Sequence, residues 1–246
     1  MASTSETGHA KNVANFEELI GFCNGYGAAY NPSKASIKIA ALQTLLTNAQ
    51  NALALVKVTK TEFDNATNDR EVAFTPLKKL ITRVVNALSA TDVVQQTIDD
   101  ANTANFKIQG RRATAKAVAK PAKEGQAAEV PNNISTSQQS FDSQVDNLAK
   151  LIQTLSAEPL YTPNEVELQV ASLNSLLTDL KSKNSAVVTA TASASNTRIQ
   201  RDQVLYETLT GLYDTAQAVK QYVKSLFGAT SPQFNQVSGI KFTTAR

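Results

Sequence analysis

The chain repeats a helix-start signal together with the pattern that follows it. Tyr30-Asn-Pro-Ser and Tyr161-Thr-Pro-Asn stand 131 residues apart. At the same offset the run Ala40–Thr47 (AALQTLLT) aligns without a gap on Ala171–Thr178 (ASLNSLLT). Chance similarity between two amphipathic helices would explain the paired leucines alone. It explains less well a Tyr-x-Pro signal followed by an ungapped run, so we predict a tandem duplication of helical repeats.

Apolar residues recur with helical spacing through most of each half. In the first half they mark a short helix ending near Gly25 and a long helix introduced by Pro32, followed by helices over Leu77–Leu88 and Val93–Ile98. We expect Pro32 and its counterpart in the second half to lie in, or just before, the first turn of a long helix. One residue of slippage then places Leu77 on Leu209.

The predicted fold is all-α, with two tandem homologous helical-bundle repeats of long antiparallel helices joined by a basic linker. No window approaches the roughly 18 consecutive apolar residues that a transmembrane helix needs. The predicted boundaries are a polar leader over 1–11, a first repeat over 12–108, a linker over 109–136 and a second repeat over 137–246.

Each repeat ends in an apolar–Lys–apolar triplet, Phe106–Ile108 and Ile240–Phe242. Alternation of this kind favours short β segments at the repeat ends. Three outcomes stay open: the segments pair with each other, offer open edges to a neighbouring molecule, or pack as irregular chain. The candidate assembly contacts are Phe106, Ile108, Ile240 and Phe242.

The charge excess of the chain is local. Residues 107–136 hold 6 basic and 2 acidic side chains, whereas the flanking halves are nearly balanced. Such a segment could neutralise phosphates and bind nucleic acid without sequence preference, but it has no aromatic residue for base stacking, so we expect that binding to be weak. From the balanced halves we expect no basic surface. The candidate nucleic-acid or partner contacts are Arg111, Arg112, Lys116, Lys120 and Lys123.

The residue inventory disfavours catalysis. The chain has one Cys and one His, and it lacks phosphate-binding glycine motifs and the Glu-x-x-His pattern of di-iron bundles. Cys23 lies on an apolar helix face and is expected in the core, and His9 falls in the polar leader. We therefore predict a non-enzymatic protein without cofactor or metal.

Charged residues make up only 18% of the chain, and Asn184–Thr197 contains none. Weakly charged helix faces of small residues allow close approach, which favours a structural or scaffolding protein that self-associates into a homo-oligomer or filament. The alternatives are a helical adaptor that binds nucleic acid through the linker, and a helical pore-forming protein, although its best insertion candidate, Ala186–Ala194, is polar. The polar segment Met1–Lys11 resembles no signal peptide, which favours a cytoplasmic location.

Overall fold

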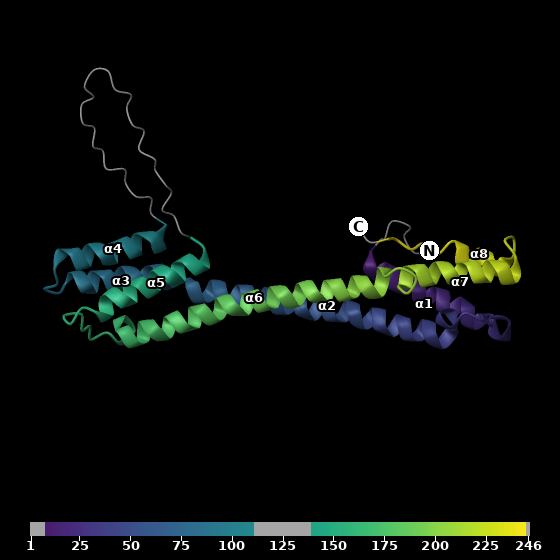
Figure 1. Cartoon of the computed structure of the whole chain (residues 1–246), viewed down its shortest axis with the longest axis horizontal. Coiled ribbons are helices and arrows are strands. Elements are labelled where there is room, and N and C mark those ends of the chain that lie inside the picture. The colour runs from purple at the N-terminus through teal and green to yellow at the C-terminus, as the bar shows by residue number, and fades with distance from the viewer. Residues whose placement is uncertain (1–7, 111–138, 245–246) are drawn as a thin grey trace, which may run out of the picture. The chain divides into compact units, whose positions relative to one another are not determined.

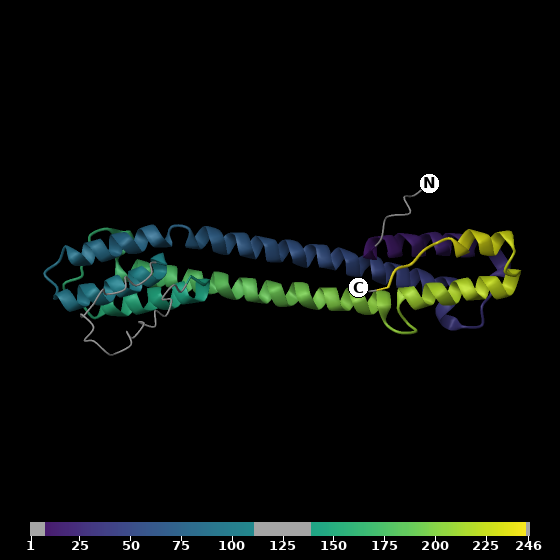
Figure 2. The same cartoon turned by 90° about the horizontal axis from the view of Figure 1, so that it is seen from above.

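The computed structural model describes residues 8–110 and 139–244, and every regular element in these two stretches is helical (Figures 1 and 2). The prediction of an all-α fold is confirmed. The elements divide between two compact units. One comprises Met1–Asp64 with Thr189–Arg246, and we call it the terminal unit; the other comprises Asn65–Val188, and we call it the central unit.

Each unit combines chain from both predicted repeats. The terminal unit takes the beginning of the first repeat and the end of the second, whereas the central unit takes the remaining parts. The two long helices, α2 (Ile39–Phe74) and α6 (Val170–Tyr206), contribute to both units. The units and the predicted repeats are thus different divisions of the chain, and the duplication stays a prediction.

The terminal unit packs short helices against the first part of α2 and the last part of α6. Its core gathers apolar side chains from all of these helices, including the fully buried Phe16, Leu42 and Val219. Figure 1 shows α1, α7 and α8 together in this unit. Its other elements are α1 (His9–Gly25), the 3₁₀ turns η1 (Gly27–Ala29) and η2 (Ala35–Ile37), α7 (Leu212–Phe227) and α8 (Pro232–Ser238).

The central unit is built in a similar way, but its helix α4 (Gln95–Gln109) is longer than α8 of the terminal unit. Leu77, Ile81 and Leu148 are fully buried in its core, which also includes Leu173 near the start of α6. The helices α3 and α5 both pack against α4. Its remaining elements are α3 (Leu77–Ser89), α4 (Gln95–Gln109), α5 (Phe141–Ser156) and the 3₁₀ turn η3 (Val166–Leu168).

Along α6 the buried positions recur every seven residues. Leu173, Leu180, Val187 and Ala194 are all buried, and this heptad spacing is typical of helices that pair along a narrow seam. In the terminal unit the pairing of α2 with α6 includes a polar contact, because the hydroxyls of Thr59 and Thr197 lie 2.8 Å apart and are buried. One hydroxyl donates to the other, and the hydroxyl that accepts donates its own proton to a carbonyl of its helix, so neither is left unsatisfied.

The same tyrosine contact precedes both long helices. The Tyr30 hydroxyl donates to the Ile37 carbonyl at 2.8 Å, and the Tyr161 hydroxyl donates to the Leu168 carbonyl at 2.8 Å. Both tyrosines are buried. Each bond closes the loop that leads into the long helix and holds the 3₁₀ turn against the core.

The prolines differ from the expectation in one respect. Pro32 and Pro163 lie outside helices, but a 3₁₀ turn follows each of them, and the long helices begin only at Ile39 and Val170. A proline fixes its own backbone and disfavours α conformation in the residue before it, which suits an extended approach to a turn as well as a helix start.

The predicted β segments are wrong, since the described residues contain no strand. Phe106–Ile108 forms the end of α4, where Ala101, Ala104 and Ile108 are buried at helical spacing. Ile240–Phe242 is irregular chain that packs against the terminal unit. An apolar–polar–apolar triplet is too short to distinguish a strand from the end of an amphipathic helix.

The expected match of Leu77 with Leu209 also fails. Leu77 is fully buried at the start of α3, whereas Leu209 lies in the turn between α6 and α7 and is 73% exposed. Leu209 has a positive φ of 67°, and Gly211 follows where a Cβ would lie 2.6 Å from the backbone nitrogen of Glu207. The turn between α6 and α7 is longer than the turn between α2 and α3. Leu212 therefore takes the buried position at the start of α7 that Leu77 takes at the start of α3.

Candidate interaction site

The predicted basic contacts and the predicted assembly contacts have different outcomes. The basic residues of the linker lie outside the described residues. Among the assembly contacts, Ile108 is fully buried in the central unit, and Ile240, 7% exposed, is buried in the terminal unit. Phe242 is half-buried, and Phe106 is 43% exposed on α4. Ile108 and Ile240 are therefore core residues of their own units and not surface contacts. The basic residues concerned are Arg111, Arg112, Lys116, Lys120 and Lys123.

The C-terminal segment is held to α1 by side-chain amides that bond to its backbone. Asn12 donates to the Thr243 carbonyl at 2.8 Å and accepts from the Thr243 N–H at 3.0 Å. One helical turn later, Asn15 donates to the Lys241 carbonyl at 2.6 Å. Because Asn12 and Asn15 are themselves buried, these bonds satisfy amides that would be costly to leave unpaired.

Lys220 of α7 holds the same segment from the other side. Its ammonium group donates to the Ile240 carbonyl and lies 5.2 Å from the centre of the Phe242 ring. Partial burial lowers the pKa of Lys220 below its usual value. The segment therefore completes its own unit, which argues against a role as an open edge.

The single histidine and the single cysteine both contact other residues of the terminal unit. His9 begins α1, where its Nδ1 lies 2.8 Å from the Tyr206 hydroxyl, and burial together with the charge of Arg201 lowers the pKa of the imidazole. The predicted extent of the polar leader, 1–11, is therefore too long. Cys23 is buried, and burial raises the pKa of its thiol to about 11. A protonated, buried thiol is a poor nucleophile.

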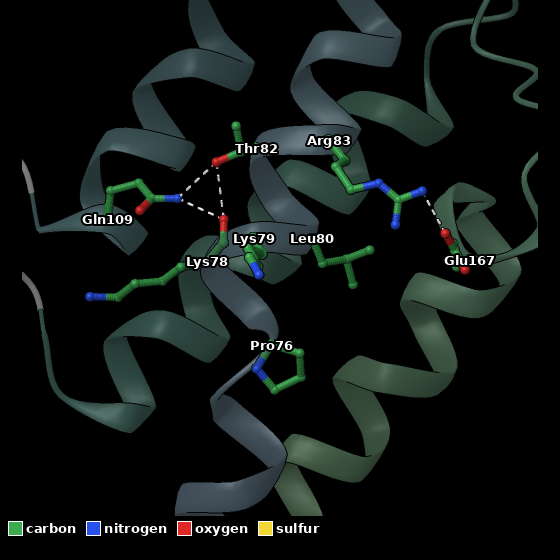
Figure 3. Close-up of a pocket in the computed structure, with 8 residues that line it drawn as sticks. All are labelled: Pro76, Lys78, Lys79, Leu80, Thr82, Arg83, Gln109 and Glu167. Atoms are coloured by element: carbon green, nitrogen blue, oxygen red, sulfur yellow. Dashed lines mark hydrogen bonds and ion pairs between the residues drawn. The ribbon is translucent and has the colours of Figure 1, made fainter.

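An open pocket of about 770 Å³ lies on the surface of the central unit, and α3 forms its floor (Figure 3). The helix is strongly amphipathic: its apolar side chains fill the core, and its outward side carries Lys78, Lys79, Thr82 and Arg83. Its 13 residues include three basic side chains and no acidic one. Pro76 at the start of α3, Leu80, Gln109 of α4 and Glu167 of η3 complete the lining.

A network of amides fixes one end of this pocket. Gln109 donates to the Lys78 carbonyl at 2.7 Å and to the Thr82 hydroxyl at 3.1 Å (Figure 3). The Lys78 ammonium group donates to Gln139 Oε1 at 3.0 Å, and the Gln139 amide donates to the Lys107 carbonyl at 3.1 Å. Because the only described partner of the Lys78 ammonium group is neutral, its charge is not compensated.

The other end of the pocket holds its only acidic side chain. Arg83 and Glu167 form an ion pair of 2.5 Å in which both side chains are more than half exposed. Lys79 lies between the two ends and makes no ion pair with any described residue (Figure 3). Exposed pairs contribute little net free energy, so Arg83 can exchange Glu167 for another anion at small cost. The pocket thus presents three cations and one weakly bound carboxylate.

The local sequence of α3 could have predicted this cationic surface, but the net charges of the two halves of the chain did not show it. The acidic residues that balance the first half lie on other segments, and none lies within Leu77–Ser89. The corresponding helix of the terminal unit, α7, has Asp214 in its first turn and a half-buried Lys220. A concentration of outward-facing cations is therefore a property of α3 and is not shared by α7.

Within the described stretches, no group of histidine, cysteine and carboxylate side chains could hold a metal ion. No helix there is both long enough and apolar enough to cross a membrane. Comparison with known protein families, with curated proteins and with solved structures finds no match.

Proposed function

We propose that the chain is a non-enzymatic structural or scaffolding protein that self-associates through weakly charged helical surfaces. The observation that carries the proposal is a pair of exposed apolar side chains on α2, Leu55 (44% exposed) and Val58 (52% exposed). Their spacing of three residues places them on one face of the helix. Exposed apolar side chains that are neighbours on one helix face favour contact with another protein surface.

The composition of α6 supports the same proposal. Between Asn184 and Thr197 this helix carries no charged residue, and Val188 and Ile199 are exposed on it. Two copies that meet through such a face would desolvate few charges, which is the main penalty of burying a polar helix surface.

Light scattering coupled to size exclusion tests this proposal. The wild-type chain is expected to form oligomers or filaments at micromolar concentration, and Leu55→Lys/Val58→Lys is expected to shift it towards monomer. The matched control, Gln43→Lys/Gln50→Lys, adds the same charge at exposed polar positions of the same helix that are not at i,i+3 or i,i+4 spacing from Leu55 or Val58. A monodisperse wild-type monomer at high concentration would rule out the proposed self-association.

We also infer that the duplication predicted from the sequence relates the two halves. Its support is the recurrence of equivalent contacts beyond the tyrosine bonds. In the central unit the rings of Phe74 and Phe141 meet edge to face at 4.7 Å, and in the terminal unit Tyr206 and His9 meet at 5.6 Å. In each pair one ring ends a long helix and the other begins a short one.

One observation favours a second function, the binding of nucleic acid through the basic linker. Gly110 and Gln139, the described residues on either side of 111–138, both lie beside the cationic helix α3. Gly110 caps α4 next to the Gln139 amide group, and Gln139 accepts a hydrogen bond from Lys78. Arg111 and Arg112 follow Gly110 directly in the sequence.

A mobility-shift assay tests this second function. At low salt the wild-type chain should retard DNA, and neutralising all five linker cations to glutamine should weaken that binding. Equal retardation by the neutralised chain would assign the binding to another surface. Absence of retardation by the wild-type chain would remove the function. The five cations are Arg111, Arg112, Lys116, Lys120 and Lys123.

A further inference from the structure

The outward face of α3 combines four features that favour an anionic partner. It holds three cations within two turns, it lacks acidic residues, it borders an open pocket, and it begins at a helix N-terminus. Lys78 and Lys79 lie in the first turn, where the helix dipole adds to the positive potential and gives no stabilisation to a lysine. A site of this kind suits an anionic partner.

The packing of α3 decides between an anionic polymer and an anionic membrane. Leu77, Ile81, Val84 and Leu88, which would have to enter the lipid, are fully buried in the core of the central unit. An interfacial membrane helix needs its apolar face free. The contact available to α3 is therefore electrostatic and involves its polar face only.

The spacing of the cations indicates phosphodiesters. Lys78 and Arg83 are separated by five residues, which corresponds to about 7.5 Å along a helix axis. Figure 3 shows their side chains extending to different sides of α3, with Lys79 between them. Phosphates along a duplex could meet cations spread across the helix in this way.

We propose that the outward face of α3, formed by Lys78, Lys79 and Arg83, binds the phosphate backbone of duplex nucleic acid without sequence preference. This inference rests on the second function proposed above and assigns it a folded contact site in addition to the linker. The lining of the pocket contains no aromatic side chain on which an unpaired base could stack, which favours a duplex over a single strand.

A substitution at Glu167 tests whether binding to the site can be strengthened as well as weakened. Its carboxylate is the one anion in the lining, and it competes with phosphate for Arg83. Removing it by Glu167→Gln adds no new cation and disturbs no buried group, because Glu167 is exposed. We expect this variant to bind duplex DNA about two- to fivefold more tightly than the wild type.

The experiment measures the affinity of the full chain for a fluorescein-labelled DNA duplex by anisotropy over a range of salt concentrations. Lys78→Gln/Lys79→Gln/Arg83→Gln should weaken binding about tenfold or more at low salt and reduce the slope of log affinity against log salt by about two to three. Circular dichroism confirms that each variant is folded.

Two further variants complete the comparison. Lys34→Gln/Lys57→Gln/Lys181→Gln removes the same charge at exposed positions on other elements and should bind more tightly than the α3 variant. Lys78→Arg/Lys79→Arg keeps the charge and should retain wild-type affinity.

The outcomes separate the inference from the function on which it rests. If the α3 variant binds as tightly as the wild type while the linker variant does not bind, the α3 site is refuted and the second function stands. If the wild-type chain does not bind the duplex at low salt, both fail. Equal weakening by the α3 and Lys34/Lys57/Lys181 variants, no gain from Glu167→Gln, or tighter binding to anionic phospholipid vesicles or to polyglutamate than to DNA would also refute the α3 site.

Discussion

Removing the hydroxyl of Tyr30 or of Tyr161 should destabilise the protein by nearly the same amount. Each phenol is buried and donates one hydrogen bond of 2.8 Å to a carbonyl at the end of a 3₁₀ turn. Tyr→Phe keeps the ring and leaves no cavity of consequence, so at Tyr161 the change isolates this hydrogen bond. At Tyr30 it also removes the contact of the hydroxyl with the Cys23 thiol, which is a weak hydrogen-bonding group.

The magnitude follows from the loss of the bond and the cost of the carbonyl left behind. A net intramolecular hydrogen bond contributes about 0.5–1.5 kcal/mol, and a buried carbonyl without its partner costs about 1–3 kcal/mol. We expect each substitution to lower the free energy of unfolding by about 1–3 kcal/mol. The tyrosines belong to different units and share no partner, so the double variant should show their sum within about 0.5 kcal/mol.

The pH dependence gives an independent check. Burial raises the pKa of Tyr161 to about 12, whereas in the unfolded chain it stays near 10. Between these values the unfolded state releases the phenolic proton and the folded state keeps it. The free energy of unfolding should therefore fall as pH rises from about 10 to 12, by at most about 1.4 kcal/mol per unit for this group. Tyr161→Phe should lack this contribution.

Urea denaturation followed by circular dichroism measures these values, with Tyr213→Phe as the control. Tyr213 lies on α7, and its hydroxyl bonds to no described residue, so that substitution should change stability by less than about 0.5 kcal/mol. A loss below this threshold at both Tyr30 and Tyr161 would refute the reasoning. So would an alkaline decline in Tyr161→Phe as steep as in the wild type.

Three other predictions concern the connection of the units and their cores. Cleavage at a protease site inserted within residues 111–138 should leave two fragments that co-elute, because both units contain chain from each side of the cut; separate elution would contradict the division into units. Ile240→Ala should lower the free energy of unfolding by about 2–5 kcal/mol in urea titrations, since this side chain is buried in the terminal unit. Leu42→Ala and Leu173→Ala, both at fully buried sites, should each lower it by about 2–5 kcal/mol, while exposed Val72→Ala should stay within about 0.5 kcal/mol.

The sequence predicted the helices well where apolar periodicity was long. The helix ending near Gly25 and the helix over Leu77–Leu88 are present as α1 and α3 with close to the expected bounds. Prediction failed where the pattern was short, as in the triplet Phe106–Ile108. Three residues do not separate a period of 2 from a period of 3.6, and burial against α5 decides the outcome.

The sequence alone could not predict that each unit combines segments from both halves of the chain. Periodicity identifies which face of α2 or α6 is buried, but it does not identify which partner covers each part of that face. The candidate site shows a related difficulty. Lys78, Lys79 and Arg83 were counted together with acidic residues of other segments, and only the burial of the opposite face of α3 shows that all three cations face outward.

Because the chain is synthesised from its N-terminus, the two units become complete at different times. All of the central unit has been synthesised once Val188 is added, whereas Met1–Asp64 must wait for Thr189–Arg246. Synthesis of the intervening segment takes roughly 6–25 s at cellular elongation rates of about 5–20 residues per second. During that time Phe16 and Leu19 of α1 lack the α7 side chains that later join them in one core. The terminal unit therefore cannot complete its core until α7 has been synthesised, and until then the apolar face of α1 is available to chaperones that bind exposed apolar segments.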